Sequence, residues 1–177
     1  MKSFIMGVVI LSTLLACNSK PSLQKYLVEK ESSPEFVSAS LSMDLLIQNL
    51  DSLSLEERES VQKIEKINVL ALLKEKGGST LEVERTTLRS ILNQTEYESL
   101  INFNGADREA KFLYSANKEN IQEIIFFGYD AKMGMLLLRM RGSNIEPNDI
   151  LKISQMGNQL NLESFSSLEN LIERFTQ

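Results

Sequence analysis

The thiol of Cys17 is the side chain that this sequence marks most clearly for chemistry. It is the only cysteine among 177 residues, and it ends a short apolar run. An aliphatic residue three positions before a cysteine and a small residue directly before it, here Leu14 and Ala16, are typical of the cleavage site of the bacterial lipoprotein signal peptidase. We therefore expect residues 1–16 to be a cleaved signal peptide and Cys17 to carry a thioether-linked lipid and an amide-linked acyl chain. Several acyl chains anchor stably, because each buried methylene contributes about 0.8 kcal/mol.

The residues on either side of this cysteine are typical of a signal peptide and a tether. Lys2 supplies a positive charge, and the apolar run after it is about a dozen residues long, whereas a membrane-spanning helix needs about 20. An ordinary secretory signal with a chance cysteine, or a buried apolar helix, is the alternative. Residues 17–34 are expected to be a lipid-anchored polar tether with a short frayed helix from Ser22 to Lys30. Because Asn18 rather than aspartate follows the cysteine, we expect the outer membrane, facing the periplasm.

The composition excludes several kinds of chemistry. Removing the first 16 of 177 residues leaves 161, which is enough for one domain with a core. The sequence holds no histidine and no tryptophan, and the lipid would consume Cys17. Imidazole bases, thiolate nucleophiles and His or Cys metal sites are therefore excluded. The net charge of −5 argues against nucleic acid as a partner. We predict no cofactor, no metal site and no enzymatic activity.

Two short polar segments suggest ion binding but have simpler interpretations. Glu56, Glu57 and Glu59 form the densest group of carboxylates and could hold a cation. We favour a charged first turn at the positive end of a helix. Residues 76–80, Lys-Gly-Gly-Ser-Thr, superficially resemble a phosphate-binding loop. Their order is wrong, because such a loop needs Gly-Lys followed by Ser or Thr, so we favour a turn and a helix cap.

Two strand patterns could present a polar surface to a partner. Ser38, Ser40 and Ser42 alternate with apolar residues, and we favour a solvated sheet face over a binding face. Arg139 and Arg141 lie on the outward side of the predicted last strand, where they could meet an anionic partner. We favour protection of a sheet edge against aggregation. Both patterns indicate a polar sheet face as the place for a binding surface.

Hydrophobic periodicity predicts the strands that must position these residues. Period-two alternation predicts a strand over 36–43, and the apolar run 67–73 predicts a central strand buried on both faces. Three further strands, separated by hairpin-length connections, predict an antiparallel meander: 110–116, 121–129 and 135–141.

Caps and apolar stripes predict the helices. A short helix is expected at 45–50, and others start at the capping boxes that begin with Ser54, Thr95 and Ser166, after Ser79 or Thr80, and at Pro147. The last helix carries apolar residues at i, i+3, i+4 and i+7: Leu168, Leu171, Ile172 and Phe175. The order of elements predicts a single α+β domain over 35–177. It should have about five mainly antiparallel strands, with the helices packed on one face.

Five fold-determining segments follow one another between about residues 20 and 155: 22–27, 67–71, 96–100, 123–127 and 138–142. In the order of these segments the chain resembles an uncharacterised family of Bacteroidetes lipoproteins, domain of unknown function 4252. The resemblance implies an envelope lipoprotein and supplies no catalytic residues.

Three hypotheses for function follow. The first is a lipid-anchored cell-envelope protein whose domain binds a protein or other partner without catalysing a reaction. The second is an envelope enzyme that uses carboxylates or lysine, which needs two carboxylates facing each other across a cleft. The third is a lipid carrier, which needs an apolar cavity of useful volume.

Overall fold

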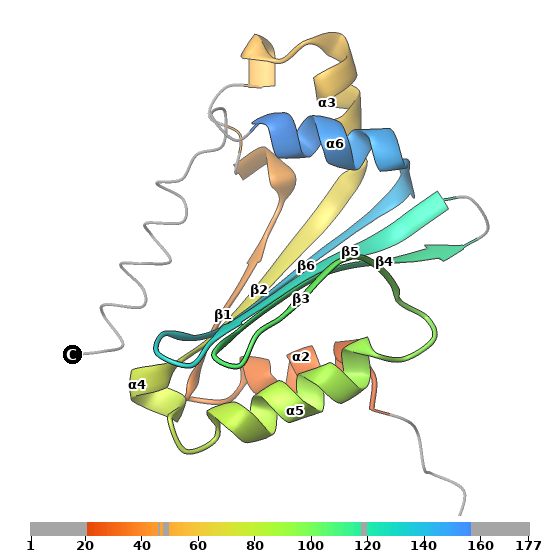
Figure 1. Ribbon diagram of the computed structural model, residues 1–177. Helices are drawn as coiled ribbons and strands as arrows, with labels where there is room; N and C mark the ends of the chain where they lie inside the picture. The colour runs from red at the N-terminus through yellow and green to blue at the C-terminus, as the bar shows by residue number, and fades with distance from the viewer. Residues whose placement is uncertain (1–20, 46, 48–49, 118–119, 157–177) are drawn as a thin grey trace, which may run out of the picture.

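A six-stranded antiparallel sheet forms the centre of the molecule (Figure 1). The computed structural model describes residues 21–156, apart from residues 46, 48–49 and 118–119. The strand order is β1-β2-β6-β5-β4-β3, so β1 and β3 are the edges of this sheet. The strands are β1 (Phe36–Leu41), β2 (Ile64–Leu73), β3 (Glu98–Asn104), β4 (Arg108–Asn117), β5 (Asn120–Asp130) and β6 (Gly134–Ile145).

Helices pack on both faces of the sheet. One face carries α2 (Leu23–Glu31) and α5 (Leu81–Leu92), and the other carries α3 (Leu55–Gln62) and α6 (Pro147–Gln155) (Figure 1). The short helix α4 (Lys74–Gly77) follows β2. The prediction of a single α+β domain is confirmed, with two differences. The sheet has six strands rather than about five, and the helices lie on both faces rather than on one.

The sequence of β2 explains why both faces need a cover. Leu70 and Leu72 belong to the core beneath α2 and α5, whereas Ile67, Val69 and Ala71 belong to the core beneath α3 and α6. None of the five is more than 6% exposed. A continuous apolar run is typical of a strand buried on both sides, so helices on one face alone would leave half of this strand in water.

Several predictions that rest on short sequence signals are confirmed. Ser54 Oγ accepts a hydrogen bond from the backbone N–H of Glu57 at 3.3 Å, and the Ser54 N–H donates to Glu57 Oε2 at 2.8 Å. This is a complete capping box at the start of α3. Pro147 occupies the first turn of α6, and β4, β5 and β6 form the predicted meander. The helix predicted at 45–50 is replaced by two short 3-10 helices, η2 (Met43–Leu45) and η3 (Leu50–Ser52).

The helix predicted from Thr95 is wrong, because this segment leads into the edge strand β3. Ile101 and Phe103 alternate with Asn102 and Asn104, which is the period of a strand with one apolar side. β3 pairs with β4 in an antiparallel register. This pairing outweighs the local helix signal, since strand formation depends mainly on cross-strand packing.

Helix α2, the first of the described helices, belongs to the folded domain. A frayed helix in a tether was expected here, but Leu23, Tyr26 and Leu27 are at most 8% exposed. The Tyr26 hydroxyl donates a hydrogen bond to Glu84 Oε2 of α5 at 2.8 Å. Ordered packing therefore begins before residue 35, where the domain was expected to start.

Two predictions lie outside the described residues. These are the lipidation of Cys17, with Leu14 and Ala16 as recognition residues, and the helix predicted after Ser166. Both stay predictions. Between residues 21 and 156, none of the described helices is both long and apolar enough to cross a membrane.

Candidate binding groove

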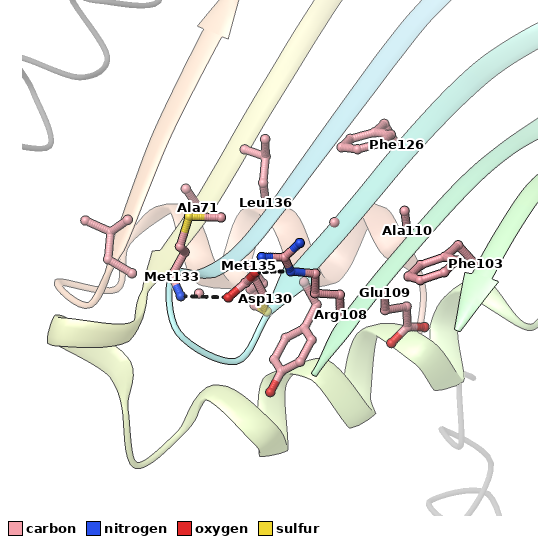
Figure 2. Close-up of a pocket in the computed structure, with 14 residues that line it drawn as sticks. Ala71, Phe103, Arg108, Glu109, Ala110, Phe126, Asp130, Met133, Met135 and Leu136 are labelled. Carbon is pink, nitrogen blue, oxygen red and sulfur yellow. Dashed lines mark hydrogen bonds and ion pairs between the residues drawn. The ribbon is translucent and has the colours of Figure 1, made fainter. Parts of the chain in front are cut away.

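A pocket of about 580 Å³ lies on the face of the sheet that carries α3 and α6. Its lining includes Met133 in the turn between β5 and β6, and Figure 1 shows this turn at the end of the sheet away from these two helices. Figure 2 shows that its lining comes from five neighbouring strands. One labelled apolar side chain from each strand is Ala71 on β2, Leu136 on β6, Phe126 on β5, Ala110 on β4 and Phe103 on β3. We call this pocket the sheet-face groove.

The register of the strands places the floor of the groove in one row across the sheet. Phe103 lies opposite Ala110, and Ala110 lies opposite Gly128. Gly128 in turn lies opposite Leu136, and Leu136 lies opposite Ala71. Because neighbouring strands are about 4.8 Å apart, a row across five strands is about 19 Å long. Three of its five residues are alanine or glycine, so the side chains near the middle of the row rise little above the sheet.

Larger side chains border this row on both sides. The next row along the strands contains Phe112, Phe126 and Leu138, which lie opposite one another on β4, β5 and β6. On the other side, Met133 stands in the turn between β5 and β6 and is 69% exposed. Small residues between two borders of large ones make an elongated apolar trough.

The polar groups at the rim form hydrogen bonds with one another. Arg108 Nε donates a hydrogen bond to Asp130 Oδ2 at 2.8 Å. Asp130 Oδ1 accepts hydrogen bonds from the backbone N–H groups of Lys132 at 2.8 Å and Met133 at 3.2 Å. The bond from the Lys132 backbone is the largest cause of the lowered pKa of Asp130. The rim therefore fixes the β5–β6 turn, and the groove itself offers mainly apolar contact.

A second pocket, also of about 580 Å³, lies between α6 and the edge strand β3. Its lining includes Leu100, Ile101 and Phe112 from the sheet and Ile150 from α6. Leu100 is 51% exposed and Ile101 is 62% exposed. Together with Phe103 at 56%, these residues show that β3 turns apolar side chains toward a face that the described helices do not fully cover.

The opposite side of β4 carries a buried ionic layer. The Glu109 side chain is fully buried and accepts hydrogen bonds from Arg85 Nε at 3.1 Å and from Arg89 Nε at 2.7 Å. Lys111 Nζ lies 3.7 Å from Glu109 Oε1. The Arg85 guanidinium also stacks 3.8 Å from the ring centre of Tyr129. Glu109 and Tyr129 are among the residues that line the groove, but Figure 2 shows the Glu109 side chain pointing toward α5, so this layer joins α5 to the sheet.

The structure separates the glutamates that were considered as a cation site. Glu57 completes the capping box, and Glu56 Oε2 forms an ion pair with Lys152 Nζ at 2.9 Å. Among the described residues, no group of three acidic side chains is placed to hold a metal ion. The segment 76–80 forms the end of α4 and the turn that leads into α5. Gly77 approaches Leu72 so closely that a Cβ would lie 2.3 Å from the Leu72 side chain.

The strand register brings the polar strand residues onto one face of the sheet, because Ser40 lies opposite Asn68 and Asn68 lies opposite Arg139. Ser38 and Ser40 are exposed on β1, which agrees with a solvated face. Arg139 does not protect an edge, because β6 lies between β2 and β5. It is 7% exposed and forms an ion pair with Glu123 at 2.8 Å. Arg141 is exposed on the same inner strand.

The carboxyl groups whose pKa is shifted do not suit acid catalysis. Every carboxyl group with a shifted pKa among the described residues has a lowered one: Glu56, Glu57, Glu82, Asp130 and Asp149. For the first four, the largest cause is a hydrogen bond donated to the carboxylate. For Asp149, burial raises the pKa, but hydrogen bonds to the carboxylate outweigh it. A general acid needs a raised pKa, so these carboxylates suit ion pairing.

The sequence did not reveal the groove. Its floor depends on which residues of five strands stand opposite each other, and a single sequence does not specify that register. One signal was present, because Ala110 and Gly128 are small residues within otherwise bulky strands. Small residues in strands often mark a close approach or a depression.

A family model described as "Domain of unknown function (DUF4252)" matches residues 31–153. The match spans the whole sheet and therefore the floor of the groove. No curated protein and no solved structure gave a match.

Proposed function

The chain belongs to the DUF4252 family, and we propose that it is a lipid-anchored protein of the cell envelope that binds an apolar segment of a partner protein in the sheet-face groove, without catalysis. The observation that carries this proposal is the sheet-face groove itself, which is about 580 Å³ in volume and is lined by residues of five strands. Binding sites are typically concave and mostly apolar, with few polar groups.

The shape of the groove favours a helical segment over an extended one. An extended peptide would add to the edge strand and follow the strand direction. The floor row instead crosses the strands, from Phe103 on β3 to Ala71 on β2. A length of about 19 Å matches a helix of about 13 residues at 1.5 Å per residue. Amphipathic helices bind in such grooves through apolar residues at i, i+3, i+4 and i+7.

The anchor supports the envelope part of the proposal. The spacing of Leu14, Ala16 and Cys17 is the basis for it. We expect Cys17→Ala to abolish labelling by an alkyne-tagged fatty acid in growing cells, whereas Ser19→Ala should leave the labelling unchanged. Labelling that persists in the Cys17→Ala chain would show that the anchor is elsewhere.

A photo-reactive residue at Met133 tests the groove in intact cells. Met133 stands at the rim and is 69% exposed, and Val83 on α5, 63% exposed, provides the control on the opposite face. We expect an adduct with another protein from position 133 but not from position 83. The cross-linked peptide should carry apolar residues at helical spacing.

A filled groove provides the specificity control. Ala110→Leu places a larger side chain on the floor, so the adduct should disappear. The groove would be refuted as the binding surface if position 133 gave no more adduct than position 83. An adduct from position 133 that persists in the Ala110→Leu chain would refute it as well. An adduct with lipid acyl chains instead of protein would favour the lipid-carrier hypothesis and overturn this one.

A further inference from the structure

The end of the described chain lies on the face that carries the groove. Helix α6 ends at Gln155, and Met156 is 2% exposed within the core that lies beneath α3 and α6. Met156, the last described residue, therefore lies on the same face of the sheet as the groove. The ten-residue step from Met156 to Ser166 reaches up to about 35 Å when extended, which exceeds the length of the groove.

The sequence of this last segment has the pattern that the groove requires. Its apolar residues are Leu168, Leu171, Ile172 and Phe175, at i, i+3, i+4 and i+7. At 1.5 Å per residue, the stripe from Leu168 to Phe175 is about 10 Å long and fits within a row of about 19 Å. An isolated helix of this length is marginal in water, so its apolar side needs a surface to pack against.

We propose that residues 166–177 bind in the sheet-face groove of the same molecule as an amphipathic helix and compete with the partner for it. This inference rests on the proposed function of the groove and adds its regulation. A tethered segment acts at a high effective concentration. Partner binding then requires displacement of the segment, and the apparent affinity for the partner falls by the fraction of time that the groove is free.

Cysteine cross-linking tests the contact directly, because Cys17 is the only cysteine in the chain. In full-length protein carrying Cys17→Ala, Met133→Cys is combined with Leu168→Cys and, separately, with Phe175→Cys, so that both helix directions are tested. Oxidation in the cell is expected to give an intramolecular disulfide for at least one pair. The same tail cysteines combined with Val83→Cys, on the opposite face, should not form one.

The outcome of the oxidation decides the occupant. A disulfide within one chain, identified by mass spectrometry of the linked peptides, supports the inference. Disulfides only between chains would identify a second copy as the occupant and would overturn it. No preferential disulfide at position 133 over position 83 would also overturn it.

A charge placed on the apolar side separates this inference from the proposed function. Leu171→Asp should free the groove, whereas Asn170→Asp adds the same charge on the polar side of the predicted helix. If the segment occupies the groove nine-tenths of the time, Leu171→Asp should raise partner affinity roughly tenfold in the Met133 cross-linking assay. Asn170→Asp should leave it unchanged.

The two ways of failing are distinguishable. A partner adduct that forms equally in wild type, Leu171→Asp and Asn170→Asp chains, with no intramolecular disulfide, would refute the competition and leave the proposed function standing. An intramolecular disulfide without any partner adduct, even in the Leu171→Asp chain, would refute the proposed function and leave the segment as a structural cover of the groove.

Discussion

Replacing Glu109 by glutamine should destabilise the domain strongly, because it removes the single fully buried negative charge among three cations. The exposed fractions of the side chains are 0% for Glu109, 10% for Arg85 and 6% for Lys111. Arg89 is 39% exposed and is partly solvated without its partner. The variant keeps the size of the side chain, so its effect reports the charge rather than a cavity.

The magnitude follows from the two cations that cannot reach water. Removing one partner of a buried ion pair costs about 3–5 kcal/mol, because the remaining charge stays desolvated. Arg85 keeps a contact with Glu82 at 3.4 Å, and Lys111 keeps a hydrogen bond to Asn93 at 2.8 Å. We therefore expect the lower end, about 3 kcal/mol. This corresponds to a fall in Tm of roughly 6–12 °C for a chain of this size.

Equilibrium urea unfolding, followed by far-UV circular dichroism, measures this loss. Glu56→Gln makes the same chemical change at a pair whose glutamate is 77% exposed, and it should cost less than about 1 kcal/mol. In a double-mutant cycle, Arg85→Gln should cost at least about 1 kcal/mol less in the Glu109→Gln background than alone. A loss below about 1 kcal/mol for Glu109→Gln, or strict additivity with Arg85→Gln, would refute the account of the ionic layer.

Two further predictions concern the pH dependence of stability and a strained turn. Asp149 has a folded-state pKa below its ordinary 3.8, since hydrogen bonds from Lys63 and Ser60 outweigh the effect of burial. Its contribution is therefore present above pH 3.8 and is lost as the pH falls through the folded value. Asp149→Asn should cost about 1.5–3 kcal/mol at pH 7, and urea titrations from pH 7 to pH 2 should show this difference shrinking; a constant difference would contradict the assignment. Gly134 has a φ of +127°, and a Cβ there would lie 2.1 Å from the backbone oxygen of Leu72. Gly134→Ala should therefore cost about 2 kcal/mol of stability. This loss corresponds to a fall in Tm of more than about 4 °C. Gly128→Ala, whose Cβ would meet only the Phe126 side chain at 3.3 Å, should change Tm by less than half as much in the same thermal scan.

The parts of the fold that were predictable are those determined by neighbouring residues. The capping box at Ser54, Pro147 in a first helical turn and the three strands of the meander depend on short-range geometry. Each signal is complete within a few residues of the chain. The apolar run of β2 also indicated burial on both sides, because such a run leaves no polar face for water.

The features that were not predictable depend on contacts between distant segments. The Thr95 segment carried a local helix signal, but β4 supplied a strand partner that the sequence alone does not identify. Arg139 was assigned to an edge because the strand order was unknown, and β2 in fact covers that side of β6. The candidate groove has the same origin, since its floor joins five strands whose register is a property of the assembled sheet.

The packing of α2 also sets how far the domain can move from a membrane. Pro21 O accepts a hydrogen bond from Gln94 Nε2 at 2.6 Å, so the folded body already holds the chain at residue 21. Four residue steps separate Pro21 from Cys17, and an extended chain covers at most about 3.6 Å per step. If Cys17 carries the proposed lipid, the domain begins within about 15 Å of its attachment point. Its encounters are then confined to a thin layer at the membrane surface, where lateral diffusion brings it to other membrane-bound proteins.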